Sequence, residues 1–195
     1  LPGEFYQLDL EMSFITQEDL FEVLEDLFEN MTRDLTQKRI SKLPFPRISY
    51  LDAINKYGSD KPDLRFGLEM VEVSDIFSDC GFKAFQGLNR KGKTLKALVV
   101  KDSAADPRSF FDKAEAHAKS LGAPGLGYII FKQDGPKGPI VKFLEPEKIE
   151  ALQKRCGITT GDTVFFGGGE WAKTCALMGQ MRQYFAALKC VVDEN

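Results

Sequence analysis

The chain begins with a stretch in which apolar and polar residues alternate. Over residues 5–14 the apolar side chains that share one side are Tyr6, Leu8, Leu10, Met12 and Phe14. A period of two predicts a strand with one packed face. The opposite face carries Gln7, Asp9 and Glu11. This row of acceptors indicates either simple exposure to solvent or the wall of a polar pocket.

The pattern then changes to a helical period. Thr16 and Asp19 form a capping-box variant, and the apolar residues that follow at helical spacing are Leu20, Leu24, Leu27, Met31 and Leu35. They predict a helix that packs on a core and turns an acidic face to solvent. The two prolines of residues 43–48 exclude a helix there. Ser49 is predicted to cap a short helix that ends at Gly58, before a polar loop.

Strands and helices interleave along the rest of the chain. We expect strands at 71–73, 83–85, 94–100 and 163–166, a short helix at 74–77, a hairpin formed by 127–132 and 139–144, and helices at 109–121, 146–156 and 170–188. Gly167–Gly169 lacks the G-x-G-x-x-G pattern and the P-loop lysine, so it predicts a tight turn rather than a phosphate cradle. The fold class is therefore α+β.

Composition narrows the class of protein. Hydrophobic residues make up 43% and charged residues 28% of the chain, which is typical of a soluble globular protein. We expect no membrane partner, no secretory signal and a cytoplasmic location. Residues 1–67 carry 8 Lys+Arg against 13 Asp+Glu, and residues 68–195 carry 18 against 16. Neither part has the basic bias of a stand-alone nucleic-acid binder.

The cysteines and the single histidine do not predict a metal site. Cys80, Cys156, Cys175 and Cys190 are widely spaced, so we expect reduced, mostly buried thiols. His117 lies inside a predicted helix and is interpreted as an ordinary helical residue. The apolar residues of the last helix are interpreted as core or interface rather than a cofactor site: Trp171, Met178, Met181, Tyr184 and Phe185.

Several segments together carry a resemblance to one family. Residues 5–14 resemble the second arm of motif 2 in bacterial-type aspartyl-tRNA synthetases, and Tyr57–Arg65 resembles the signature loop of that family. Residues 68–169 are similar to its GAD insertion domain, with landmarks at Lys142–Leu144 and Asp162–Gly167. The resemblance covers nearly the whole chain.

The resemblance implies a division of the chain and a set of site residues. Residues 1–67 would be part of a class II catalytic core, 68–170 a GAD domain with a mixed sheet and helices, and 171–195 a helix leading back to the core. Asp9 matches the residue that binds the ammonium of aspartate, Gln7 would line the pocket, and Glu11 is a weaker candidate. The loop residues placed near this pocket are Ser59, Asp60 and Lys61.

For the parent protein the resemblance implies L-aspartate, ATP, Mg²⁺ and tRNA-Asp as ligands and a homodimer as the assembly. Whether tRNA-Asn is also charged stays open. The motif 2 arginine, motif 1, motif 3 and the anticodon-binding domain of the family are not found in these residues. We therefore expect the chain alone to bind no ATP or Mg²⁺ and to lack ligase activity.

The insertion has two alternative interpretations. Basic residues cluster around the loop 87–92 and are candidate tRNA contacts: Lys83, Arg90, Lys91, Lys93 and Lys96. If they bind RNA, we expect phosphate contacts and strong salt dependence. The other interpretation is a structural module that braces the catalytic core, with an ordinary solvated basic loop.

Overall fold

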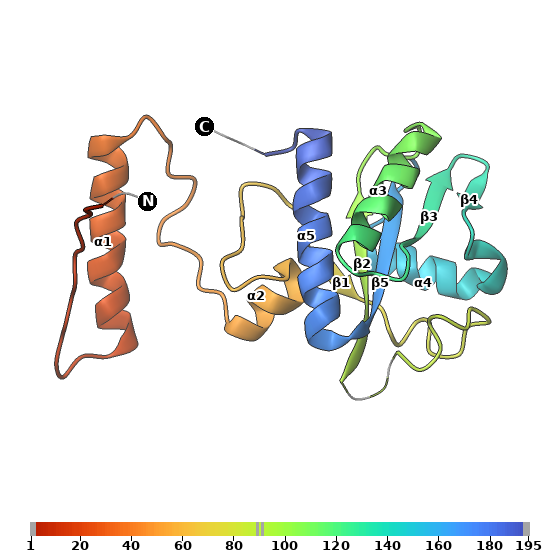
Figure 1. Cartoon of the computed structure of the whole chain (residues 1–195), viewed down its shortest axis with the longest axis horizontal. Coiled ribbons are helices and arrows are strands. Elements are labelled where there is room, and N and C mark those ends of the chain that lie inside the picture. The colour runs from red at the N-terminus through yellow and green to blue at the C-terminus, as the bar shows by residue number, and fades with distance from the viewer. Residues whose placement is uncertain (1–2, 89, 91, 193–195) are drawn as a thin grey trace. The chain divides into compact units, whose positions relative to one another are not determined.

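The structure is a computed structural model that describes residues 3–88, 90 and 92–192 (Figure 1). The chain divides into two compact units, with the boundary between Arg47 and Ile48. This boundary separates compact units of the structure. The expected functional boundaries, after residues 67 and 170, stay a prediction.

The first unit is built around helix α1 (Gln17–Leu35). Thr16 caps it as predicted: the Asp19 amide donates to the Thr16 hydroxyl, and the Thr16 amide donates to Asp19 Oδ2 at 2.7 Å. The expectation that this helix packs on a core is wrong, because none of its residues is buried and Phe28 is 52% exposed. A unit of this length has too little chain to cover the apolar stripe.

Residues 5–12 follow an extended course without forming the predicted strand, and residues 13–14 form a bend in which Phe14 has a φ of +58° (Figure 1). A strand requires a neighbour to receive its backbone hydrogen bonds, and no ladder partner for this segment lies among the described residues. The side chains on both sides are exposed, including Tyr6 and Phe14. The predicted strand is therefore wrong, and the alternation agrees only with the extended course of residues 5–12.

The second unit contains a five-stranded sheet with the order β1-β2-β5-β3-β4. The strands are β1 (Met70–Glu72), β2 (Lys93–Val100), β3 (Gly127–Lys132), β4 (Gly135–Lys137) and β5 (Thr163–Glu170). Every pair in this sheet is antiparallel, so the α+β class is confirmed but the expected mixed sheet is wrong. Two parallel strands that are neighbours need a long crossover connection between them. Here β5 lies between β2 and β3 and is antiparallel to both, so β2 and β3 are not neighbours.

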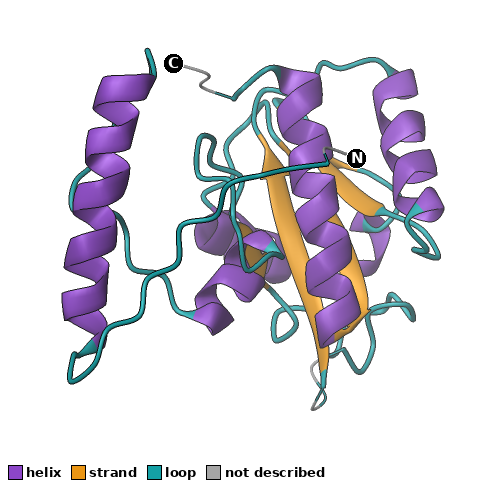
Figure 2. Cartoon of the chain, turned by 60° about the vertical axis from the view of Figure 1, so that its left-hand side comes forward, coloured by secondary structure: helices purple, strands orange, loops and turns teal. Residues whose placement is uncertain are grey.

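The helices of the second unit agree with the sequence patterns. They are α2 (Tyr50–Tyr57), α3 (Arg108–Ser120), α4 (Pro146–Cys156) and α5 (Trp171–Lys189). Ser49 caps α2 and Gly58 ends it in the left-handed conformation. Helix α5 lies along the central strands β2 and β5 (Figure 2). Within the described part of the chain, no helix is long and apolar enough to cross a membrane.

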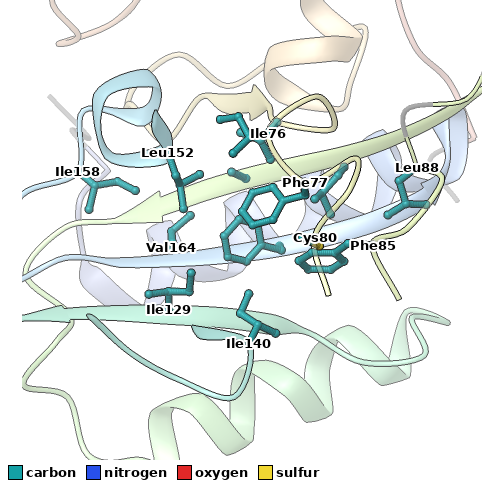
Figure 3. Packing of buried hydrophobic residues seen from close by; sticks show 14 of the residues in the cluster. Ile76, Phe77, Cys80, Phe85, Leu88, Ile129, Ile140, Leu152, Ile158 and Val164 are labelled. Atoms are coloured by element: carbon teal, nitrogen blue, oxygen red, sulfur yellow. The ribbon is translucent and has the colours of Figure 1, made fainter. Parts of the chain in front are cut away.

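The sheet buries both faces, which explains its nearly continuous apolar strands. Phe165 and Leu98 face α3 and α5, where they pack with Phe111 and Phe185. The neighbouring Phe166 belongs to the cluster on the opposite face. Figure 3 shows this cluster, which also contains Leu152 of α4 and side chains from the loops: Phe77, Cys80 and Phe85.

Two short elements of this unit were predicted wrongly. Residues 74–79 form turns rather than a helix, and 83–85 also lie in turns rather than a strand. Phe77 and Phe85 are buried with ring centroids 5.5 Å apart, so their apolar side chains fill the core without regular backbone structure. Segments this short have too few backbone hydrogen bonds to define an element by themselves.

The predicted second arm of the hairpin is displaced toward the turn. Strand β3 pairs with residues 135–137, and residues 141–143 form a 3₁₀ turn instead of a strand. Pro139 has no amide hydrogen to give to a ladder, which disfavours a strand through this position.

The predicted turn at Gly167–Gly169 is also wrong, because these glycines continue strand β5. A Cβ atom at Gly167 would lie 2.5 Å from the sulfur of Met178, and one at Gly168 would lie 2.5 Å from a methyl of Leu88. The missing side chains therefore permit close packing across the sheet. The sequence signal was that of a turn, but the physical reason is close approach.

Candidate functional site

The extended segment brings two of the predicted site residues together. Gln7 Nε2 donates a hydrogen bond of 2.6 Å to Asp9 Oδ1. Side chains two residues apart in an extended backbone point the same way, and the alternation had placed Gln7 and Asp9 on one face. A carboxylate offers about four lone-pair sites, and the bond to Gln7 uses one of them. Asp9 therefore keeps acceptor capacity for a cationic group.

Glu11 lies two residues further along the same extended segment and is exposed. No contact between Glu11 and the Gln7–Asp9 pair is seen in the described structure. It stays the weaker candidate of the three.

The predicted signature loop follows α2 in the second unit. Ser59 is half-buried and its hydroxyl accepts from the amide of Lys61 at 3.1 Å, while Asp60 and Lys61 expose their side chains. Asp63 and Arg65 close the loop by an ion pair of 2.7 Å. The hydrogen bond from Arg65 lowers the pKa of the Asp63 carboxyl against the opposing effect of burial. The loop therefore has internal order and an exposed charged tip.

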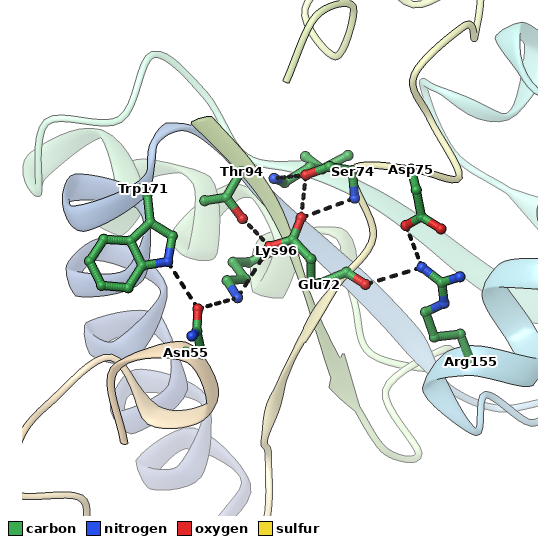
Figure 4. Close-up of polar contacts among 9 residues, drawn as sticks. Asn55, Glu72, Ser74, Asp75, Thr94, Lys96, Arg155 and Trp171 are labelled. Carbon is green, nitrogen blue, oxygen red and sulfur yellow. Dashed lines mark hydrogen bonds and ion pairs between the residues drawn. The ribbon is translucent and has the colours of Figure 1, made fainter. Parts of the chain in front are cut away.

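A partly buried polar cluster connects α2 to the sheet (Figure 4). Asn55 of α2 accepts from Lys96 Nζ at 3.1 Å and from Trp171 Nε1 at 2.9 Å. Lys96 also pairs with Glu72 at 3.2 Å, opposite it in the β1–β2 ladder. Because one amide oxygen joins residues of three elements, Asn55 fixes the base of α2 on the sheet.

Glu72 is held as a carboxylate at this junction. Burial alone would raise its pKa, but hydrogen bonds from Ser74 and Thr94 and the charge of Lys96 together lower the pKa of Glu72 below its usual value. Lys96 is only 2% exposed. The negative charge of Glu72 offsets the cost of burying the Lys96 ammonium.

The basic residues proposed as tRNA contacts do not all lie on one surface. Lys83, Arg90 and Lys93 are exposed, and the amide of Lys93 donates to the carbonyl of Arg90 at 3.0 Å. Lys91 lies outside the described residues. Lys96 is buried and its ammonium contacts Asn55 and Glu72, so it is not available to a phosphate in this structure. Its place inside an apolar strand was the signal that a buried partner was needed.

The remaining titratable residues have structural surroundings. His117 stacks on the ring of Tyr184 with centroids 4.2 Å apart. Cys80 and Cys175 are buried, Cys190 is exposed, and burial raises the pKa of the Cys156 thiol to about 11. In the part of the chain that is described, no group of three His, Cys, Asp or Glu residues could hold a metal ion.

One residue close to the loop had no sequence signal. Arg182 of α5 is 1% exposed and donates to main-chain carbonyls between Asp63 and Leu68. The helical pattern placed it among apolar residues, and its partners lie more than 100 positions earlier in the chain.

Comparison with known proteins identifies the family. The profile described as tRNA synthetases class II (D, K and N) matches residues 1–166. The chain belongs to this family. It is 52% identical over 187 residues to the aspartate–tRNA(Asp/Asn) ligase of Prosthecochloris aestuarii, which covers 96% of the chain. The ligases of the same name from Chlorobaculum parvum and Chlorobium chlorochromatii are 53% and 54% identical over 95% and 96% of the chain.

The match to the class II profile and the identity to these ligases confirm the resemblance to aspartyl-tRNA synthetases that was based on residues 5–14 and the loop 57–65. The chain spans 31% of the length of each of these three relatives. The activity of a complete protein is therefore a matter of proposal.

Proposed function

We propose that this chain is part of an aspartate–tRNA ligase, which activates L-aspartate with ATP and then charges a tRNA. The observation that carries the proposal is the identity of 52% to a relative named for this activity, over 96% of the chain. The contact between Gln7 and Asp9 supports it, because it presents a carboxylate and an amide on one side of an extended segment.

Asp9 is assigned to the ammonium of the aspartate substrate. A carboxylate binds a cationic head group by charge-assisted hydrogen bonds, which are about twice as strong as neutral ones. Gln7 orients the Asp9 carboxylate through its 2.6 Å hydrogen bond. The signature-loop residues Ser59, Asp60 and Lys61 are assigned to the surroundings of the same pocket, and Glu11 stays a weaker candidate for binding the substrate.

Asp9→Asn in the complete synthetase should raise the KM for aspartate by about 10- to 100-fold. The substitution keeps the shape of the side chain but removes a charged hydrogen bond that contributes about 1.5–3 kcal/mol, and each 1.4 kcal/mol is tenfold in affinity. Aspartate-dependent exchange of pyrophosphate into ATP measures the effect, with the KM for ATP determined in parallel.

Asp34→Asn is the matched control, since Asp34 is an exposed carboxylate at the end of α1. It should leave both KM values within about twofold, as expected for a surface change. An unchanged KM for aspartate in Asp9→Asn would remove Asp9 from the pocket. Complete absence of aspartate-dependent exchange in the unmodified synthetase would contradict the proposed activity.

The described residues do not by themselves fit Mg²⁺, since no three potential ligands cluster among them. We assign ATP and Mg²⁺ to other parts of the complete synthetase and derive no step through them from this chain. A homodimer, a cytoplasmic location and tRNA-Asp as the RNA substrate follow from the same proposal.

Residues 68–170 are proposed to be the GAD insertion domain, and its basic loop is a second candidate site. The specific observation is that Arg90 and Lys93 are exposed and joined by a 3.0 Å backbone hydrogen bond. Two neighbouring cations can contact consecutive phosphates of an RNA backbone. The alternative, a structural brace for the catalytic core, predicts no effect of these charges on tRNA binding.

Replacing Arg90 and Lys93 together by glutamate should weaken tRNA binding by the complete synthetase and flatten its salt dependence. The slope of log affinity against log salt should fall by about one for each lost phosphate contact. Titration of labelled tRNA at several salt concentrations measures this slope. Lys113→Glu, at an exposed position of α3, is the control for a charge reversal away from the loop, with half the charge change of the double variant. Equal slopes in the double variant and the unmodified protein would favour the structural brace.

A further inference from the structure

The segment that leaves the signature loop is held by a side chain from α5. Arg182 Nη2 donates to the carbonyls of Asp63 at 2.6 Å, Phe66 at 3.1 Å and Gly67 at 3.1 Å, and Nε donates to Leu68 at 3.1 Å. These carbonyls belong to backbone between α2 and β1 that has no regular secondary structure. The arginine therefore supplies the hydrogen bonds that a helix or a sheet would otherwise provide.

Aromatic rings complete the surroundings of this guanidinium. Its carbon lies 4.1 Å from the ring centre of Phe66 and 4.9 Å from that of Tyr57. Burial lowers the pKa of Arg182, against the opposing charge of Asp63, but a guanidinium stays protonated at any physiological pH. A buried charge is stabilised here by carbonyl dipoles and ring faces, an arrangement that depends on the planar fork of arginine.

The other end of the loop touches the same helix through backbone atoms. A Cβ at Gly179 would lie 2.7 Å from the carbonyl oxygen of Tyr57 and 2.9 Å from the Cα of Gly58. Gly179 and Arg182 are three residues apart and therefore share one side of α5. Helix α5 thus fixes both the entry and the exit of the loop, while Ser59, Asp60 and Lys61 lie between these two attachments.

We propose that Arg182 is a positioning residue for the signature loop, and through it for the aspartate pocket. The inference rests on the proposed function for its catalytic consequence, but not for the attachment itself. Arg182 holds the exit of the loop, so its loss releases the carbonyls from Asp63 to Leu68 and lets the charged tip change its orientation. Because α5 also packs on β2 and β5, the same helix links the sheet of the insertion to the loop.

Arg182→Lys and Arg182→Gln in the complete synthetase test the proposal. Lysine keeps the charge but, as a point charge, cannot bond the same set of carbonyls, whereas glutamine keeps polarity and loses the charge. We expect kcat/KM for aspartate to fall by about 10- to 100-fold in both, mainly through KM, because misplacement of a pocket by about 1 Å has effects of this size. The KM for ATP should stay within about twofold.

Amide hydrogen exchange provides a readout that does not depend on activity. Exchange over residues 58–68 should accelerate at least tenfold in both variants of the present chain, while the amides of β2 and β5 keep their protection. Lys173→Gln, at an exposed lysine of the same helix, should change neither exchange nor kinetics.

The outcomes separate the two proposals. If loop exchange is faster in the Arg182 variants but the unmodified synthetase has no aspartate-dependent activity, the attachment is supported and the proposed function is contradicted. Unchanged loop exchange in folded Arg182→Lys would overturn the positioning role, as would equal losses for aspartate and ATP. If Arg182→Gln fails to fold, Arg182→Lys alone decides between these results.

Discussion

Phe185→Ala should lower the free energy of unfolding of the second unit by about 3–5 kcal/mol, the range for removing a buried phenylalanine ring. Phe185 is fully buried on α5, with its ring centre 4.5 Å from that of Phe165 and 5.8 Å from that of Phe110. The lost ring leaves a cavity between α5 and the sheet, which the neighbouring aromatic rings can fill only in part. Urea denaturation of the purified chain, followed by circular dichroism, measures the change.

Leu188→Ala is the matched control on the same helix. Leu188 lies three residues after Phe185 and is 44% exposed, so its truncation removes little buried surface. We expect a loss below about 1 kcal/mol, as for most substitutions at exposed positions. Similar losses in the two variants would mean that α5 does not pack on the sheet through Phe185.

The elements that could be predicted from sequence are those defined by neighbours in the chain. Thr16 and Ser49 signalled helix starts because their hydroxyls accept from amides three residues later. Gly58 signalled a helix end, and Pro146 a helix start, for equally local reasons. These signals need no knowledge of the rest of the fold, which explains why the α-helices seen in the described residues were predicted with nearly correct bounds.

The failures share a dependence on distant residues. Residues 5–14 have the alternation of a strand, but a ladder partner decides whether one forms. Phe85 was predicted in a strand because it is apolar, whereas it packs against Phe77 and Phe166 from a turn. The glycines of β5 resembled a turn because nothing local shows that Met178 and Leu88 approach them. Antiparallel order in the sheet is likewise a property of the whole unit.

The candidate site divides in the same way. The period of two placed Gln7 beside Asp9, and their hydrogen bond is a local consequence of an extended backbone. The roles of Asp9 and of the loop 58–65 came from resemblance, and they stay predictions. The anchoring of α2 by Asn55 and of the loop by Arg182 could not be predicted, because their partners lie 41 to 119 residues away.

Gly58→Ala should lower the free energy of unfolding by about 2–5 kcal/mol. Gly58 has a φ of +72°, and an alanine in this left-handed conformation costs about 1–2 kcal/mol. The added methyl would also meet the carbonyl oxygen of Cys175 and lie 2.6 Å from the Cα of Gly179. Both obstacles are backbone atoms of α5, so they cannot rotate away, and overpacking of this kind adds about 1–3 kcal/mol. Thermal and urea unfolding of the purified chain measure the sum.

Gly157→Ala separates the two contributions, because Gly157 ends α4 in the same left-handed conformation, at a φ of +59°. A Cβ at Gly157 would meet no atom within 4 Å, so this variant should show only the conformational cost of about 1–2 kcal/mol. The excess loss in Gly58→Ala then measures how tightly α2 is pressed against α5 where the signature loop begins. Equal losses of unfolding free energy in the two variants would contradict this contact. They would also contradict the inference that α5 holds the start of the signature loop.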